Sequence, residues 1–98
     1  MYDRLTPQHF VQMAQALSTL SLSKPRRIVA EVAAKNDIGF HTLLSSNRTH
    51  KVAHARQEAM LRLRRETDLS LPQIGRIFKR DHSTVIHGIR RASQREAI

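Results

Sequence analysis

The most constraining feature of this sequence is a pair of short helical segments that follow each other almost without a break. SLPQIGRIF spans residues 70–78, and DHSTVIHGIRR spans residues 81–91. Ser70 and Asp81 each predict the start of a helix, because their side chains can accept hydrogen bonds from free N–H groups at a helix N-terminus. A turn of so few residues prevents antiparallel packing, so we expect the two helices to cross steeply as a helix-turn-helix.

The remainder of the chain also carries the helical period, and no segment alternates apolar and polar residues as a β-strand does. We therefore expect an all-α fold, a compact helical domain with a basic loop before the helix-turn-helix. The expected elements are a helix at 7–20 capped by Thr6, a helix from the cap Ser23 to 36–39, a short buried turn at 40–44 with Phe40, Leu43 and Leu44, a polar loop at 45–51, and a helix at 52–67.

Apolar spacing assigns the faces of the two longest helices in the second half of the chain. The final helix should turn Val85, Ile86, Ile89 and Ala92 inward. The helix at 52–67 should turn Val52, Ala55, Ala59, Leu63 and Met60 inward and leave Arg56, Arg62, Arg64 and Arg65 largely outward.

Charge is unevenly distributed between the two ends of the chain. The protein carries 17 Lys and Arg against 8 Asp and Glu, a net charge of +9. Residues 1–23 hold one arginine and one aspartate, whereas residues 48–95 hold 12 basic and 4 acidic side chains. Such an excess favours a polyanionic partner for the second half. We expect a DNA-binding domain at 24–98, and an N-terminal helix at 1–23 that covers its apolar floor or binds another protein.

Several classes of function are disfavoured by what the sequence lacks. It has no cysteine and no apolar run long enough for a signal peptide or membrane span, which suits the cytoplasm and, with this charge, the nucleoid. It has no G-x-x-x-x-G-K-[ST] phosphate loop. His50 and His54 alone make a poor metal site, and neighbours on one helix such as Asp81, His82 and Ser83 cannot form a catalytic triad. We expect no enzyme activity, cofactor, metal, membrane or small-molecule substrate.

The start of the final helix carries the groups that DNA readout requires. Asp81 can accept from a cytosine amino group, His82 can donate to a base or pack on a thymine methyl, and Ser83 and Thr84 can bind bases or phosphates. An acid or hydroxyl at a helix start is more often only a cap. The basic side chains around this tip favour the DNA interpretation; they are Arg76, Lys79, Arg80, Arg90 and Arg91.

The sequence RDHSTVIHGIRRA at 80–92 resembles the signature of the C-terminal DNA-binding domain, domain IV, of the bacterial replication initiator DnaA. The resemblance continues upstream through LPQIG at 71–75, VAHARQEAM at 52–60, LLSS at 43–46 and VAEVA at 29–33, about 70 residues in all. In that family the signature helix reads the major groove of a short AT-rich box, and an arginine of the basic loop enters the minor groove.

The resemblance implies a role for individual residues. Asp81, His82 and Ser83 would read the major groove with Pro72 close by, and Arg48 would enter the minor groove. Phosphates would be bound by side chains or backbone N–H groups of Arg56, Gln57, Arg64, Leu71 and Thr84. From the charge pattern we add further phosphate contacts at Lys51, Arg76, Lys79 and Arg80.

The sequence departs from the family pattern at three places. Ser83 stands where the family usually has threonine, the turn FKRD is one residue shorter than the usual turn with two glycines, and the basic loop NRTHK holds fewer arginines. These departures concern the exact box and the affinity.

Two functions remain open at this level. The first is sequence-specific binding of double-stranded DNA at a DnaA-box-like site, to regulate replication initiation or transcription. The second is an adaptor that binds the replication initiator or its regulators through helix 7–20, with weak or non-specific DNA binding.

Overall fold

The computed structural model describes residues 23–97, which form five helices and no strand. In chain order the helices are α2 (Lys24–Lys35), α3 (Phe40–Leu44), α4 (His50–Glu66), α5 (Leu71–Phe78) and α6 (His82–Glu96). This confirms the predicted all-α fold. The helix predicted at 7–20 lies outside the described residues. None of the described helices has the length and apolar character needed to cross a membrane.

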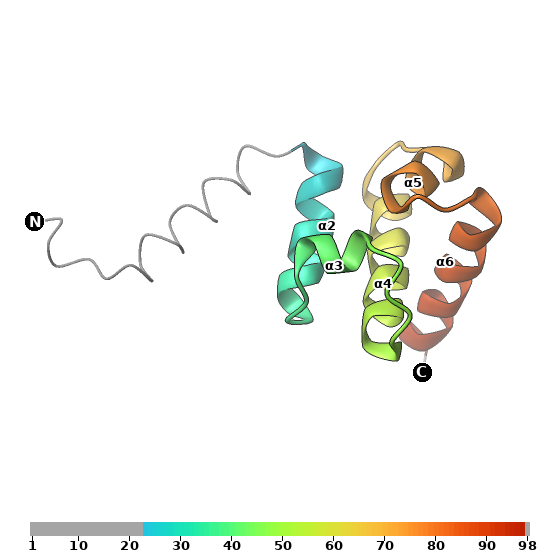
Figure 1. The fold of residues 1–98 in the computed structure, drawn as a ribbon. Coiled ribbons are helices and arrows are strands. Elements are labelled where there is room, and N and C mark those ends of the chain that lie inside the picture. Colours follow the sequence, from blue (N-terminus) through green and yellow to red (C-terminus); the bar gives the residue numbers. More distant parts are fainter. Residues whose placement is uncertain (1–22, 98) are drawn as a thin grey trace, which may run out of the picture.

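Helix α4 occupies the centre of the described domain. Figure 1 shows α2 and α3 on one side of it and α5 and α6 on the other. The core lies between these layers and includes Val32, Leu43, Leu63, Phe78 and Val85, all at 0% exposure. Each such buried side chain contributes ~1.5–3 kcal/mol to the stability of the fold. This packing holds α6 against α4.

Helices α2 and α3 follow the sequence prediction closely. Helix α2 begins after Ser23, ends before Asn36, and buries Ile28, Val29, Val32 and Ala33 along one face. In α3 only Leu43 is buried, while Phe40 and Leu44 are half-buried. The prediction of three buried residues was therefore too broad, because a helix of five residues presents little more than one turn to α4.

Helix α4 begins two residues earlier than predicted, at His50 instead of Val52, and ends at Glu66 instead of Thr67. The early start has a local cause. The side-chain oxygen of Asn47 accepts hydrogen bonds from the N–H and the hydroxyl of Thr49, at 2.9 and 2.8 Å, which turns the chain into the helix. The polar loop is therefore 45–49, and Lys51 stands in the first turn of α4.

Both predicted caps of the helix-turn-helix are confirmed. Ser70 Oγ accepts from the Gln73 N–H at 3.2 Å, and Gln73 Oε1 accepts from the Ser70 N–H at 2.8 Å. This reciprocal pair satisfies two N–H groups at the start of α5. Asp81 Oδ1 accepts from the Thr84 N–H at 3.0 Å and caps α6.

The turn between α5 and α6 is as tight as the sequence predicted. Lys79 adopts the left-handed conformation, with φ 55°. Its N–H donates to Arg76 O at 3.3 Å, and the Arg80 N–H donates to Gly75 O at 2.8 Å. These two bonds satisfy carbonyls at the end of α5 and reverse the chain direction.

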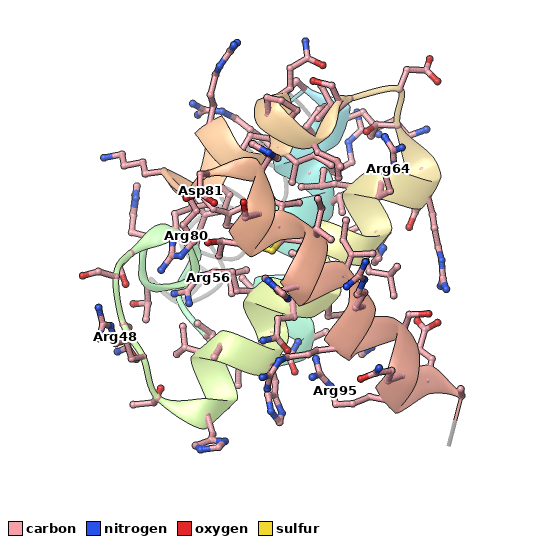
Figure 2. The ribbon with its side chains drawn as sticks, turned by 90° about the vertical axis from the view of Figure 1, so that its right-hand side faces the viewer. Arg48, Arg56, Arg64, Arg80, Asp81 and Arg95 are labelled. Carbon is pink, nitrogen blue, oxygen red and sulfur yellow. The ribbon has the colours of Figure 1, made fainter. Side chains whose placement is uncertain are left out.

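Two glycines allow close approaches within this unit. A Cβ atom on Gly75 would overlap the carbonyl oxygen of Arg80, and one on Gly88 would lie 2.7 Å from Met60 Sδ. Gly88 therefore lies close to Met60 and Gln57 of α4. Figure 2 shows α6 crossing α4 steeply. Glycine at these positions thus brings α6 close to both α5 and α4.

Candidate nucleic-acid interface

The loop 45–49 and the start of α6 lie on the same side of the molecule. Figure 2 shows Arg48, Arg56, Arg80 and Asp81 together on this side. The guanidinium of Arg80 joins the two elements, because its Nη2 donates to Ser45 O at 3.2 Å. The structure therefore brings the predicted minor-groove residue and the predicted major-groove residues to one surface.

The first turn of α6 is open to solvent. Asp81, His82, Ser83 and Thr84 are all exposed. The hydrogen bond from the Thr84 N–H lowers the pKa of the Asp81 carboxyl below its usual 3.8, so the group is an anion at neutral pH. A carboxylate has about four lone-pair sites, so Asp81 can accept from a base while it caps the helix.

The prediction that Arg56 points outward is wrong. Arg56 is buried, with 6% of its surface exposed. Its Nε donates to Leu43 O at 3.0 Å, and its Nη2 donates to Ser45 O and Asn47 O at 2.8 and 3.0 Å. Burial, followed by the nearby charge of Arg80, lowers the pKa of the guanidinium. Helical spacing could not reveal this, because two of the three acceptors belong to the irregular loop 45–49.

A cleft separates the crossing helices α4 and α6 beside this tip. It is lined from α4 by Arg56 and Gln57, from the turn by Arg80, and from α6 by Thr84, His87 and Arg91 among others. The sequence predictions did not mention His87, and they named Arg91 only among the basic side chains around the tip, without a contact of its own. The spacing of 84, 87, 88 and 91 on one face of α6 was the signal that could have found them.

Gln57, a predicted phosphate contact, is oriented by the far end of α6. Arg95 Nη1 donates to Gln57 Oε1 at 2.7 Å, and Arg95 Nη2 donates to His54 O at 3.3 Å. The amide oxygen is held by Arg95, and the amide nitrogen can still donate to another group. A side chain held in this way is suited to donate to a phosphate oxygen.

Three other predicted contacts belong to the end of α4 and the start of α5. Figure 2 shows Arg64 toward the opposite end of α4 from Arg48 and Arg56. Arg64 is exposed, and its Nη1 makes a long hydrogen bond of 3.4 Å to Leu69 O, just before α5. Leu71 is the first residue of α5, where an N–H lacks an intrahelical acceptor, and Pro72 beside it is exposed. These three residues form a second group of candidates.

The four ion pairs between described residues all include a side chain from one face of α4. They are Lys35–Glu58 at 2.9 Å, Arg62–Glu31 at 2.9 Å, Arg62–Glu66 at 2.6 Å and Arg65–Glu96 at 2.7 Å. The helical period places their α4 members on a different face from Gln57 and Arg64. In contrast, most exposed basic residues form no ion pair with other described residues. They include Arg48, Lys51, Arg76, Lys79, Arg90 and Arg91, and also Lys24, Arg26, Arg64 and Arg95.

His50 and His54 lie at the start of α4. Their rings meet edge to face with centroids 5.7 Å apart. Desolvation, and then the charge of Arg95, lowers the pKa of His54. Within the described part of the chain, no group of three or more His, Cys, Asp or Glu side chains is arranged to hold a metal ion.

Comparison of the sequence with known proteins places the chain in a family. The family model described as "Bacterial dnaA protein helix-turn-helix" matches residues 25–92. The chain is similar to proteins named chromosomal replication initiator protein DnaA: 47% identical over 68 residues in Cutibacterium acnes, 44% over 66 residues in Tropheryma whipplei strain Twist, and 40% over 83 residues in Thermoanaerobacter sp. strain X514.

These alignments cover 68%, 66% and 80% of this chain. They cover only 14%, 14% and 19% of the relatives, so the chain corresponds to a small part of their length. The matched residues contain α3 to α5, the tight turn and the exposed start of α6 described above. The chain belongs to the family of the bacterial DnaA helix-turn-helix domain.

Proposed function

We propose that this protein binds double-stranded DNA at a DnaA-box-like site and regulates replication initiation or transcription. The observation that carries the proposal is the placement of the loop with Arg48 beside the exposed first turn of α6. A helix-turn-helix inserts the start of its second helix into the major groove, and an arginine on an adjacent loop can reach the minor groove. A protein with this role would act at the nucleoid in the cytoplasm.

The proposed contacts divide into two kinds. Asp81, His82 and Ser83, with Pro72 nearby, read base edges in the major groove, and Arg48 reads the minor groove. The phosphates are held by Gln57, Arg64, Lys51, Arg76, Lys79, the side chain of Thr84 and the N–H of Leu71. Arg56 and Arg80 line the cleft with Gln57 and Thr84, although several of their N–H groups already donate within the protein.

A pair of substitutions tests this division. His82→Ala should cost ~1–3 kcal/mol of binding free energy on a box duplex and reduce the preference over a scrambled duplex. Arg64→Ala should weaken both duplexes equally and lower the slope of log K against log salt by ~1. Titrations of both variants at several salt concentrations provide the measurement. An unchanged box preference in His82→Ala would show that His82 is not a base reader.

A further inference from the structure

The carbonyl oxygen of Ser45 accepts hydrogen bonds from two guanidinium groups that come from different parts of the chain. Arg56 Nη2 donates to it from α4 at 2.8 Å, and Arg80 Nη2 donates to it from the turn before α6 at 3.2 Å. Arg80 Nη1 also donates to Phe78 O, at the end of α5, at 2.6 Å. The planar guanidinium of Arg80 therefore bridges the end of α5 and the first residue of the loop.

The loop itself is internally ordered. Ser45 Oγ donates to Thr42 O at 2.6 Å and accepts from the Asn47 N–H at 3.2 Å, and Asn47 Oδ1 accepts twice from Thr49. These bonds shape the loop but do not reach the helix-turn-helix. The position of Arg48 relative to α6 thus depends on side chains that reach the loop from outside, namely Arg56 and Arg80.

The two arginines are held together against their mutual repulsion. Within the described part of the chain, neither forms an ion pair with an acidic side chain. Arg56 is buried and Arg80 is half-buried, whereas the neighbouring Lys79 is exposed. A group that only attracts phosphate needs exposed charge, which Lys79 supplies. A planar guanidinium that donates to two carbonyls at once, as Arg80 does, fixes the position of one carbonyl relative to the other.

We propose that Arg80 is a positioning residue for DNA recognition, because it fixes the loop that carries Arg48 relative to the first turn of α6. The proposal rests on the DNA-binding function proposed above. If DNA is bound in both grooves, Arg48 and the first turn of α6 must reach hydrogen-bonding distance of their bases at the same time. A loop displaced by loss of Arg80 would still attract DNA, but it would no longer align Arg48 with its groove when α6 is docked.

Three variants separate positioning from phosphate binding, with Lys79→Ala as the matched control from the same turn. Arg80→Ala and Arg80→Lys should each reduce the ratio of box to scrambled affinity by ~5- to 50-fold, with a nearly unchanged salt slope. Arg80→Lys keeps the charge but cannot reproduce the planar fork. Lys79→Ala should weaken both duplexes alike, lower the slope by ~1 and keep the ratio.

The same titrations can overturn the proposal. If Arg80→Ala weakens both duplexes equally and lowers the slope by ~1, as expected for Lys79→Ala, Arg80 is a phosphate contact. Full retention of the ratio by Arg80→Lys would also exclude the positioning role, and this variant remains informative if Arg80→Ala fails to fold.

A measurement without DNA distinguishes failure of this proposal from failure of the proposed function. If the wild-type protein shows no box preference, the proposed function fails. Amide hydrogen exchange of residues 46–49 in the free protein then tests Arg80. Faster exchange in Arg80→Ala and Arg80→Lys than in Lys79→Ala supports a role in fixing the loop, and equal exchange in all three overturns it.

Discussion

Arg56 is an arginine whose hydrogen-bond acceptors are backbone carbonyls of its own chain. Its guanidinium extends from α4 to the loop 45–49 and donates to the backbone oxygens of Leu43, Ser45 and Asn47. Arginine is rarely buried, because its charge is costly to remove from water unless every donor finds an acceptor. The residue therefore links the stability of the fold to the position of the loop.

Replacement of Arg56 should be measurably destabilising. Arg56→Ala removes the guanidinium donors of the Leu43 and Asn47 carbonyls and should lower the free energy of unfolding by ~1–3 kcal/mol. Arg64 is an exposed arginine on the same helix, so Arg64→Ala should change the free energy of unfolding by no more than ~0.5 kcal/mol. Urea denaturation of both variants makes the comparison. Equal midpoints for the two would contradict the structural role of Arg56.

The cap at Asp81 predicts a pH-dependent contribution to stability. Folding lowers the pKa of its carboxyl from the usual 3.8, so the charged carboxylate contributes its full stabilisation at pH values above 3.8. This stabilisation is lost as pH falls below about 4, through the folded pKa. The loss of Tm in Asp81→Ala should therefore be larger at pH 6 than at pH 3. A loss that is the same at both pH values would show that the charged cap does not contribute.

At the scale of elements, the α5–turn–α6 unit depends on contacts between backbones. Gly75 faces the carbonyl of Arg80, and Lys79 takes a left-handed conformation that an L-residue with a side chain adopts at a cost. These two positions set the angle at which α6 leaves the turn. Their substitution should have opposite effects on stability.

Gly75→Ala should destabilise the protein by about 2 kcal/mol or more, because its methyl group has no space beside the Arg80 carbonyl. Gly39→Ala is the matched control. Gly39 has φ −64°, and a Cβ there would lie 3.4 Å from the Thr42 hydroxyl. Thermal unfolding of both variants tests the argument. Comparable stability of the two variants would contradict the close approach at Gly75.

Lys79→Gly should stabilise the protein by ~0.5–1 kcal/mol, because glycine relieves the left-handed conformation by more than it adds to the entropy of the unfolded chain. Chemical denaturation with the wild type as reference provides the measurement. A lower stability of Lys79→Gly would mean that the Lys79 side chain contributes more than its backbone strain costs.

The sequence predicted the helices, both caps of the helix-turn-helix and the tight turn, because these depend on residues close in the chain. Ser70, Asp81 and the spacing of Val85 and Ala92 are examples. It did not predict the start of α4 or the burial of Arg56. Both depend on how the loop 45–49 folds back through Asn47, and irregular backbone has no period that a sequence pattern can display.

At the scale of the whole molecule, charge is segregated between surfaces. Ion pairs neutralise the face of α4 that carries Glu58, Arg62 and Arg65. The exposed basic side chains of the loop, the turn and α6 make no ion pair with the described acidic residues. In the proposed function, these exposed charges would attract a polyanion, and the exposed groups at the start of α6 would then discriminate among DNA sequences.

The most direct test of the proposed function is a comparison of two labelled duplexes, one with the AT-rich initiator box and one scrambled, by fluorescence anisotropy at low and high salt. We predict that both affinities fall as salt rises and that the box preference persists at the higher salt, because base contacts depend less on released counterions. Equal and steeply salt-dependent binding of both duplexes would contradict sequence-specific recognition and would favour the adaptor.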